Sequence, residues 1–99
     1  MAWTVEFSTS VKKTKKKLPN KINEALASLV KDLEMQGPVR KDWPNFSALG
    51  KQRKVIPPNA YHCHLRKGNP TYVACWSVED KTIKLIEIFY VGTHENAPY

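Results

Sequence analysis

Apolar and polar residues alternate near the start of the chain, over positions 3–7. The apolar members of this stretch are Trp3, Val5 and Phe7. Side chains of a strand point to opposite faces in turn, so the alternation places these three on one face. The pattern predicts a half-buried β-strand that turns its apolar face toward a core.

Two helices are predicted after this strand. Residues 10–17 are rich in lysine and follow hydroxyl side chains that suit a helix N-cap, which predicts a short helix facing solvent or a polyanion. Pro19 suits the first turn of a second helix, and Gly37-Pro38 suits its end. Apolar residues recur between them with the spacing of one helical face: Ile22, Leu26, Leu29, Val30 and Leu33. We therefore expect a helical hairpin that packs on a sheet.

Residues 39–60 follow neither the helical nor the strand period, and we expect an irregular loop there. A loop of this length in a compact domain is usually functional or mobile. We expect Trp43, Phe46 and Leu49 to anchor part of it to the core. The basic segment 51–54 is expected not to pack.

Three strands are predicted in the last third of the chain, at residues 61–66, 71–76 and 83–91, with turns between them. The third is nearly continuous in apolar residues, which favours a central strand covered on both faces. The whole order predicts one α+β domain over residues 1–99. In it, an N-terminal strand and a two-helix hairpin precede a three-stranded antiparallel meander, which completes a four-stranded sheet.

Alternation along the first of these strands separates two sets of side chains. Tyr61, Cys63 and Leu65 share one face, and His62, His64 and Arg66 share the other. In the next strand, Val73 and Cys75 lie opposite Tyr72, Ala74 and Trp76. We expect both cysteines to be reduced and buried in the core behind the histidine face, because two cysteines make no secreted disulfide framework. Trp76 is also expected in the core.

Charge narrows the possible partners. The chain has 16 Lys+Arg against 9 Asp+Glu, a net charge of +7. This excess favours a polyanion such as RNA, DNA, an anionic membrane surface or an acidic protein. No apolar run approaches the length of a membrane span, and residues 1–7 lack the basic-then-apolar order of a signal peptide. We therefore expect a cytoplasmic protein.

The histidines suggest a chemistry for that partner. All 3 histidines lie in the closing strands and tail, where His94 can reach His62 and His64. Cleavage of RNA by its own 2′-hydroxyl needs a base, an acid and cations near phosphorus, and these residues with Arg66 and Lys67 supply them without a metal or other cofactor. Alternative interpretations are a polar surface or a zinc site. Zinc is less favoured because Cys63 points away from its histidine neighbours.

The strand Tyr61-His62-Cys63-His64-Leu65-Arg66 and the ending Gly92-Thr93-His94, four further residues and Tyr99 resemble the RelE/ParE toxin superfamily of bacterial toxin–antitoxin modules. The ribosome-dependent mRNA endonucleases of the RelE, HigB and YafQ type are the most similar branch. Element order is similar over nearly the whole chain, whereas the motifs lie in its last 40 or so residues. The resemblance implies a RelE-like fold, an antitoxin partner, and action on mRNA in the ribosome.

The resemblance also implies roles for particular residues. His64 is the expected general base, and His94 or Tyr99 is the expected acid. Stabilisation of the phosphate is expected from Arg66, Lys67 and, if charged, His62. The expected RNA-binding residues are Lys51, Arg53, Lys54, Lys67 and Tyr72.

The sequence also departs from the family pattern. Val73, Ala74 and Cys75 occupy the region where many RelE-type toxins carry an arginine. Two alternatives therefore stay open. One is a ParE-like toxin that inhibits DNA gyrase, and the other is a catalytically weak module that binds RNA or an antitoxin.

Overall fold

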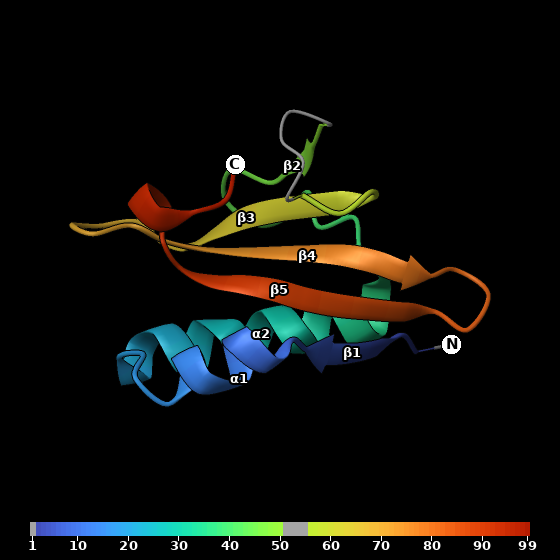
Figure 1. The fold of residues 1–99 in the computed structure, drawn as a ribbon, viewed down its shortest axis with the longest axis horizontal. Helices are drawn as coiled ribbons and strands as arrows, with labels where there is room; N and C mark the ends of the chain where they lie inside the picture. The colour runs from blue at the N-terminus through green and yellow to red at the C-terminus, as the bar shows by residue number, and fades with distance from the viewer. Residues whose placement is uncertain (1, 51–55) are drawn as a thin grey trace.

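A computed structural model describes residues 2–50 and 56–99 of the chain. In order, its elements are β1 (Thr4–Phe7), α1 (Thr9–Lys15), α2 (Asn20–Gln36), β2 (Ser47–Leu49), β3 (Ala60–Arg66), β4 (Tyr72–Asp80), β5 (Leu85–Thr93) and the 3-10 helix η1 (His94–Asn96). The predicted α+β class is confirmed. The two helices form one layer and the strands form the other (Figure 1).

The five strands that the structure describes form one mixed sheet in the order β1-β5-β4-β3-β2. β1 runs parallel to β5, and each of the other neighbouring pairs is antiparallel. The helical hairpin between β1 and β2 carries the chain across the sheet from one edge to the other. The predicted meander is therefore present as β3, β4 and β5, with an edge strand on each side.

Local sequence explains where the helices begin and end. The Ser8 hydroxyl accepts a hydrogen bond from the backbone N–H of Val11 and caps α1. Pro19 precedes α2, as its fixed φ favours. Gly37 ends α2 with a φ of 91°, and a Cβ there would lie 3.0 Å from Nε1 of Trp3. Glycine at this position thus allows both the turn and the close approach of β1.

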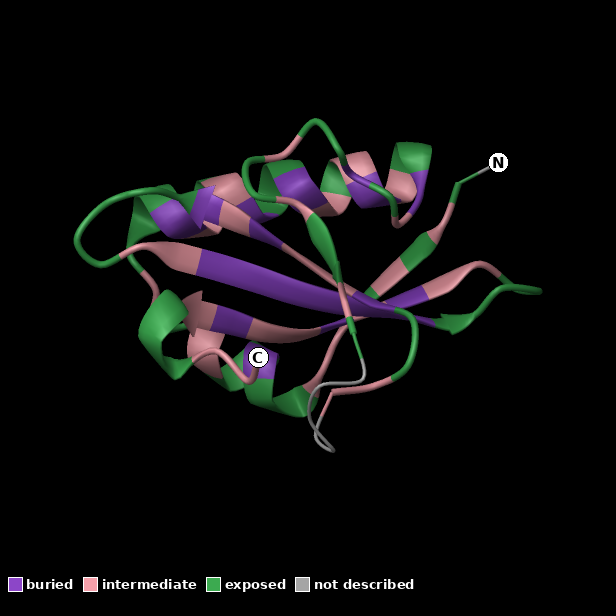
Figure 2. Cartoon of the chain, turned by 90° about the horizontal axis from the view of Figure 1, so that it is seen from above, coloured by how far each residue is buried: buried purple, intermediate pink, exposed green. Residues whose placement is uncertain are grey.

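The core lies between α2 and the sheet. Helix residues Val11, Ile22, Leu26, Leu29 and Leu33 pack against sheet residues Cys63, Leu65, Ala74, Trp76, Ile86, Ile88 and Val91. Trp76 is fully buried, as predicted. Figure 2 shows buried residues along the middle of the sheet and on the side of the helices that faces it. The other face of the sheet, here called the open face, carries no helix of the layer formed by α1 and α2.

Three details differ from the sequence expectations. Residues 47–49 form β2 on the edge of β3, so the described sheet has five strands and not four. The last strand begins at Leu85, and Ile83 is 65% exposed in the turn before it. The most continuously buried strand is β4, from Val73 to Val78, because residues of the open face also cover it. The expectation that the third strand of the meander is covered on both faces is wrong, since part of β5 stays half-exposed.

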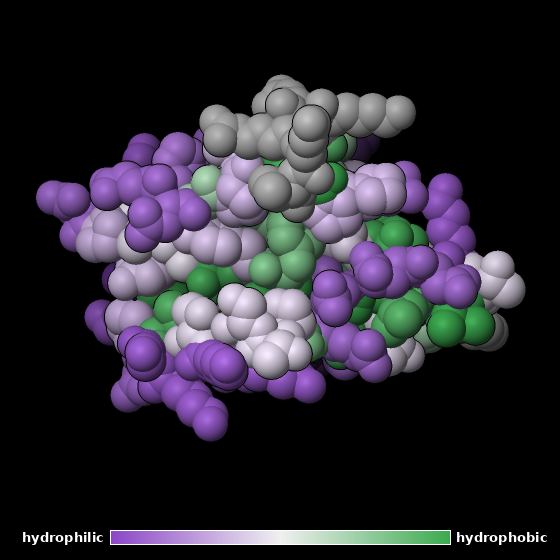
Figure 3. Space-filling view, viewed as in Figure 1, coloured by the Kyte–Doolittle hydropathy of each residue, from purple (hydrophilic) through white to green (hydrophobic). Residues whose placement is uncertain are grey.

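The anchors predicted in the 39–60 segment are partly confirmed. Trp43 and Phe46 pack against the core, and the Trp43 indole donates a hydrogen bond to Asp32. Leu49 is half-buried in β2. In Figure 3, hydrophilic side chains project from the region of α1, the lysine-rich helix. Neither helix in the described ranges is long and apolar enough to cross a bilayer.

Candidate functional site

Two rows of side chains cross the open face of the sheet. Cross-strand register pairs His62 of β3 with Cys75 of β4, which in turn pairs with Tyr90 of β5. The next row joins His64, Val73 and Gly92 in the same order. Residues that face each other in register point to the same side of a sheet, so the two histidines stand beside a floor of buried β4 residues.

The end of the chain then folds back over these rows. The backbone N–H of His94 donates to the carbonyl of Thr71 at 2.8 Å, which holds η1 against the start of β4. Ring centroids are 5.6 Å apart for His64 and His94, 5.9 Å for His94 and Tyr99, 4.4 Å for Tyr99 and His62, and 6.2 Å for His62 and His64. The four rings form a closed group, here called the histidine cluster. The predicted convergence of the histidine strand and the tail is thus present.

Tyr90 and Gly92 fix the turn that places His94 beside His64. The Tyr90 hydroxyl donates a hydrogen bond to the carbonyl of Thr93 at 2.7 Å. A Cβ at Gly92 would lie 2.6 Å from that hydroxyl oxygen, a distance that side chains do not tolerate. Gly92 is therefore needed for the Tyr90 ring to cross the backbone just before His94.

Strand β2 contributes a polar contact to the cluster. Its Ser47 pairs in register with His62, and Oγ of Ser47 lies 3.1 Å from Nδ1 of His62. This hydrogen bond leaves Nε2 of His62 as the ring nitrogen available to other groups. Ser47 therefore orients His62, which is otherwise held between His64 and Tyr99.

The environment of the cluster lowers the pKa of two histidines. Burial is the largest cause for His62, followed by the nearby His64, while a hydrogen bond to the Ser47 backbone acts in the opposite direction. Burial also lowers the pKa of His64, and the neighbouring His94 and Lys67 lower it further. Both rings therefore favour the neutral form at physiological pH, which is the form able to accept a proton.

Tyr99 and Cys75 have the opposite shift. Burial, with smaller effects of Cys75 and Tyr90, raises the pKa of Tyr99 to about 12. Its hydroxyl oxygen is buried and has no hydrogen-bond partner among the residues that the structure describes. Burial likewise raises the pKa of the Cys75 thiol to about 12. Both groups remain protonated near neutral pH, and the Tyr99 hydroxyl is a free donor inside the cluster.

A cleft opens beside the cluster, with a volume of about 290 Å³. It is lined by His64, His94, Glu95, Thr71 and the Gly68–Pro70 turn. Both histidines line the cleft, but His94 is exposed and His64 is half-buried. A ligand in the cleft therefore contacts both rings. The cleft thus brings two possible proton-transfer groups to one place.

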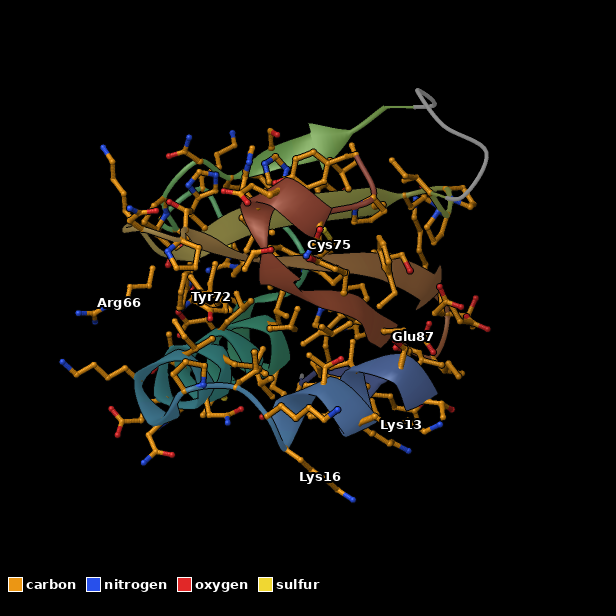
Figure 4. All side chains as sticks on the ribbon, turned by 60° about the vertical axis from the view of Figure 1, so that its left-hand side comes forward. Lys13, Lys16, Arg66, Tyr72, Cys75 and Glu87 are labelled. Carbon is orange, nitrogen blue, oxygen red and sulfur yellow. The ribbon has the colours of Figure 1, made fainter. Side chains whose placement is uncertain are left out.

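Arg66 does not join the cluster, which corrects the expectation from strand alternation. The register of β3 and β4 shifts between His64 and Arg66, so that Arg66 pairs with Tyr72. Such a bulge inserts one extra residue and breaks the period of two. In Figure 4 the Arg66 side chain projects outward at the left of the view and Tyr72 lies between the sheet and α2, both away from Cys75. Both residues line a different pocket, together with Lys67.

Cys75 is also placed differently from the expectation. Both cysteines are free and buried, as predicted. Cys63 packs in the core between sheet and helices, but Cys75 pairs with His62 and therefore lies on the open face. It forms part of the floor under the histidine cluster.

The remaining expected site residues divide in two groups. Lys67 is exposed at the end of β3 and lies near enough to His64 to lower its pKa. Lys51, Arg53 and Lys54 fall in residues 51–55, outside the described part of the chain. Within the described ranges, no three His, Cys, Asp or Glu side chains are arranged to hold a metal ion.

Three residues of the site, Ser47, Tyr90 and Glu95, were not singled out by the sequence. Ser47 lies in a strand of three residues, too short to give a periodic signal. Tyr90 is part of an apolar run that suggests only a buried strand. Glu95 directly follows His94, and this adjacency to a candidate residue was the one available signal. Gly92 belongs to the motif that ends at His94, but the motif did not show its contact with Tyr90.

Comparison with known proteins rests on structure. A scan against models of protein families finds no match, and a search of curated proteins finds none. Two solved structures share the fold. One is the archaeal RelE–RelB complex from Pyrococcus horikoshii, with a TM-score of 0.72 and 19% identity over 98% of this chain and 100% of that chain.

The second is an arginine-to-alanine double mutant of the E. coli toxin RelE in the free state. Its TM-score is 0.69 and its identity is 18%, over 98% of this chain and 88% of that chain. Both alignments include β1, the helical hairpin and the strands that carry the histidine cluster, because they leave almost no residue of this chain uncovered. Over nearly its whole length, the chain has a RelE-like fold.

Proposed function

We propose that this protein is the toxin of a type II toxin–antitoxin module and cleaves mRNA on the ribosome without a metal. The observation that carries the proposal is the closed group of His62, His64, His94 and Tyr99 beside an open cleft. The RelE-like fold and the net charge of +7 support it. The reaction is attack of a ribose 2′-oxygen on the adjacent phosphorus, which breaks the bond to the 5′-oxygen.

His64 acts as the general base in this proposal. It lines the cleft, and its lowered pKa keeps the imidazole neutral at physiological pH. The neutral ring takes the proton of the 2′-hydroxyl as the new oxygen–phosphorus bond forms. His62 lies deeper, against Ser47 and Tyr99, and positions the neighbouring rings.

His94 or Tyr99 gives a proton to the departing 5′-oxygen. His94 is exposed in the cleft and suits direct contact with the substrate. Tyr99 holds its proton because of its raised pKa, and its hydroxyl makes no hydrogen bond to the described residues. Because this hydroxyl is buried and Tyr99 does not line the cleft, His94 is the residue placed to reach the departing oxygen directly.

The negative charge on the phosphate is balanced by fewer cations than the sequence suggested. Arg66 faces away from the cluster, which leaves Lys67 as the described lysine or arginine that acts on His64 in the cleft. Because the local charge is low, orientation by the ribosome carries a larger part of the catalysis in this proposal. The protein is then expected to cleave free RNA poorly.

The partners follow from the same proposal. RelE from P. horikoshii is in complex with RelB, and by analogy an acidic antitoxin binds this chain over its basic surface. mRNA and ribosomal RNA are the proposed nucleic-acid partners, with Lys51, Arg53 and Lys54 as further phosphate contacts. The proposed location is the cytoplasm, where ribosomes are found.

The test is cleavage of mRNA on programmed ribosomes, with the products mapped by primer extension. Wild-type protein is expected to cut at the A site, and His64→Ala and His94→Ala are expected to lose the products. Lys31→Ala, an exposed change on α2 away from the cleft, serves as the control. Cleavage by both histidine variants at the wild-type rate would overturn the assignment. Loss of DNA supercoiling on expression, with translation intact, would favour a ParE-like toxin instead.

A further inference from the structure

A second pocket lies across the Gly68–Pro70 turn from the histidine cluster. Its volume is about 400 Å³, within the range of sites for small organic groups. The start of α2 forms one wall and the end of β3 with the following turn forms the other. Its apolar surface comes from Ile22, Pro70 and Tyr72. Tyr72 is half-buried, with part of its ring packed on the core and the rest available to the pocket.

The charges around this pocket have a single sign. Lys21, Arg66 and Lys67 line it and are exposed, and none of its described lining residues is acidic. α2 begins here without a side-chain cap and without an acidic residue in its first turn, so the helix dipole adds positive potential. An occupant is therefore expected to combine a flat or apolar group with negative charge.

The same turn connects this pocket to the cleft of the histidine cluster. Gly68, Asn69 and Pro70 line both cavities. A chain molecule that places a phosphate beside His64 reaches the second pocket by passing over this turn. Lys67, at the start of the turn, lines the second pocket and also influences His64. The two cavities are neighbouring subsites for one extended ligand.

We propose that this pocket binds a nucleotide of single-stranded RNA next to the one whose phosphate lies at the histidine cluster. The base stacks on Tyr72, and Arg66 and Lys21 bind the flanking phosphates. Stacking on an aromatic ring together with a cationic rim is the usual basis of single-strand binding. The inference rests on the proposed function for the direction of the strand, but the pocket has its own chemistry and its own test.

This assignment gives Arg66 and Tyr72 a joint role. The bulge that removes Arg66 from the histidine face pairs it with Tyr72, so the same irregularity in β3 builds the second pocket. An acidic peptide could satisfy the cations. The aromatic ring and the shared turn favour RNA, because a single strand presents a base to stack on Tyr72 and a phosphate for the neighbouring cleft.

The test measures binding of a fluorescent RNA tetranucleotide whose 2′-O-methyl riboses prevent cleavage. Tyr72→Leu keeps an apolar side chain but removes the ring, and it is expected to weaken binding about tenfold. Lys21→Gln is expected to weaken binding severalfold and to reduce the slope of log Kd against log salt by about 0.7. Lys31→Gln, an exposed lysine on the same helix outside the pocket, is expected to bind as wild type.

A change in the RNA separates stacking from other effects of Tyr72. A probe with one abasic nucleotide is expected to bind wild type more weakly, yet to bind Tyr72→Leu as well as the intact probe does. Because Tyr72 contacts the core, Lys21→Gln provides a variant whose fold is not at risk.

The two proposals fail in different ways. If Tyr72→Leu and Lys21→Gln bind the RNA probe like wild type, the pocket assignment is wrong, even if an acidic peptide binds there and His64→Ala stops cleavage. If the wild-type protein leaves mRNA on programmed ribosomes uncut while the pocket variants lose RNA binding, the proposed function is wrong and the pocket assignment stands.

Discussion

The open face of the sheet has a histidine end and a glutamate end, and the two are built on the same strands. At one end, the rows through Cys75 and Val73 include His62 and His64, and residues 94–99 fold over them. At the other, Glu87 of β5 pairs with Glu6 of β1 and with Ser77 of β4, whose hydroxyl donates to Glu79. Figure 4 shows Cys75 beside η1, and Glu87 toward the opposite end of β5.

Each end gathers ionisable side chains of one type, and their charged forms repel one another. The two ends reduce this repulsion in different ways. Burial and the neighbouring rings lower the pKa of the histidines, which become neutral near physiological pH. Burial, with Glu79 and Glu6, raises the pKa of Glu87, yet a carboxylate remains charged over most of the physiological range. The histidine end can therefore approach a phosphate with little cost, whereas the glutamate end repels it. In the proposed function, this difference between the two ends orients a bound polyanion, with its phosphate at the histidine end.

The largest effect is expected from removing the proposed base. His64→Ala is predicted to lower the single-turnover rate of mRNA cleavage on ribosomes by about 10²–10⁴-fold, the usual range for a general base. Glu87→Gln is the matched change at the other end of the face and is predicted to stay within about twofold. Equal losses in the two variants would show that the ends do not differ in function.

A second prediction concerns the glycine that supports His94. Gly92→Ala places a Cβ against the Tyr90 hydroxyl and is expected to lower the free energy of unfolding by about 1–3 kcal/mol, as overpacking does. It should also reduce cleavage, because the turn before His94 must shift. Chemical denaturation and ribosome cleavage are the measurements. Adding Tyr90→Leu should restore part of the stability, and a double variant no more stable than Gly92→Ala would contradict the proposed clash.

The third prediction is a pH dependence. A base must be neutral, and the pKa of His64 is lowered from 6.5, so protonation of His64 should reduce the cleavage rate only when the pH drops below 6.5. Lys67 is one cause of the shift, and Lys67→Gln should therefore move this acid limb to higher pH. Rates measured from pH 5 to 8 test this. If wild type and Lys67→Gln lose activity over the same acid pH range, His64 is not the titrating base.

The smallest effect is expected on stability, from a change at the glutamate end of the open face. Because the folded pKa of Glu87 is raised, its ionisation destabilises the fold at neutral pH and has no such effect well below pH 4.5, where the folded and unfolded states are both protonated. Glu87→Gln is expected to raise the free energy of unfolding by a few tenths of a kcal/mol at pH 7, with the gain vanishing in acid. Glu24→Gln, an exposed change on α2, is the control in urea denaturation. A gain in stability of the same size for Glu24→Gln would show that the effect does not come from the neighbouring glutamates of Glu87.

The periodic pattern of apolar and polar residues determined which side chains face the core and which share the open face. Strand alternation placed His62 and His64 on one face, helical spacing identified Ile22, Leu26 and Leu29 as core, and both results depend only on local geometry. The motif around His94 and the resemblance built on it led to a RelE-like fold, which the structural comparison confirms. The grouping of His94 and Tyr99 with the strand histidines was also predicted from the sequence.

Tertiary structure alone decided which other residues join that group. A one-residue bulge before Arg66 turns that side chain to the helix side, and no local pattern reveals a bulge because it changes the period only once. Register between strands, set by pairing over long separations, put Cys75 beneath His62 and Ser47 beside it. The sequence thus determined the two faces of the regular parts of each strand, whereas the pairing of strands and the bulge determined which side chains meet.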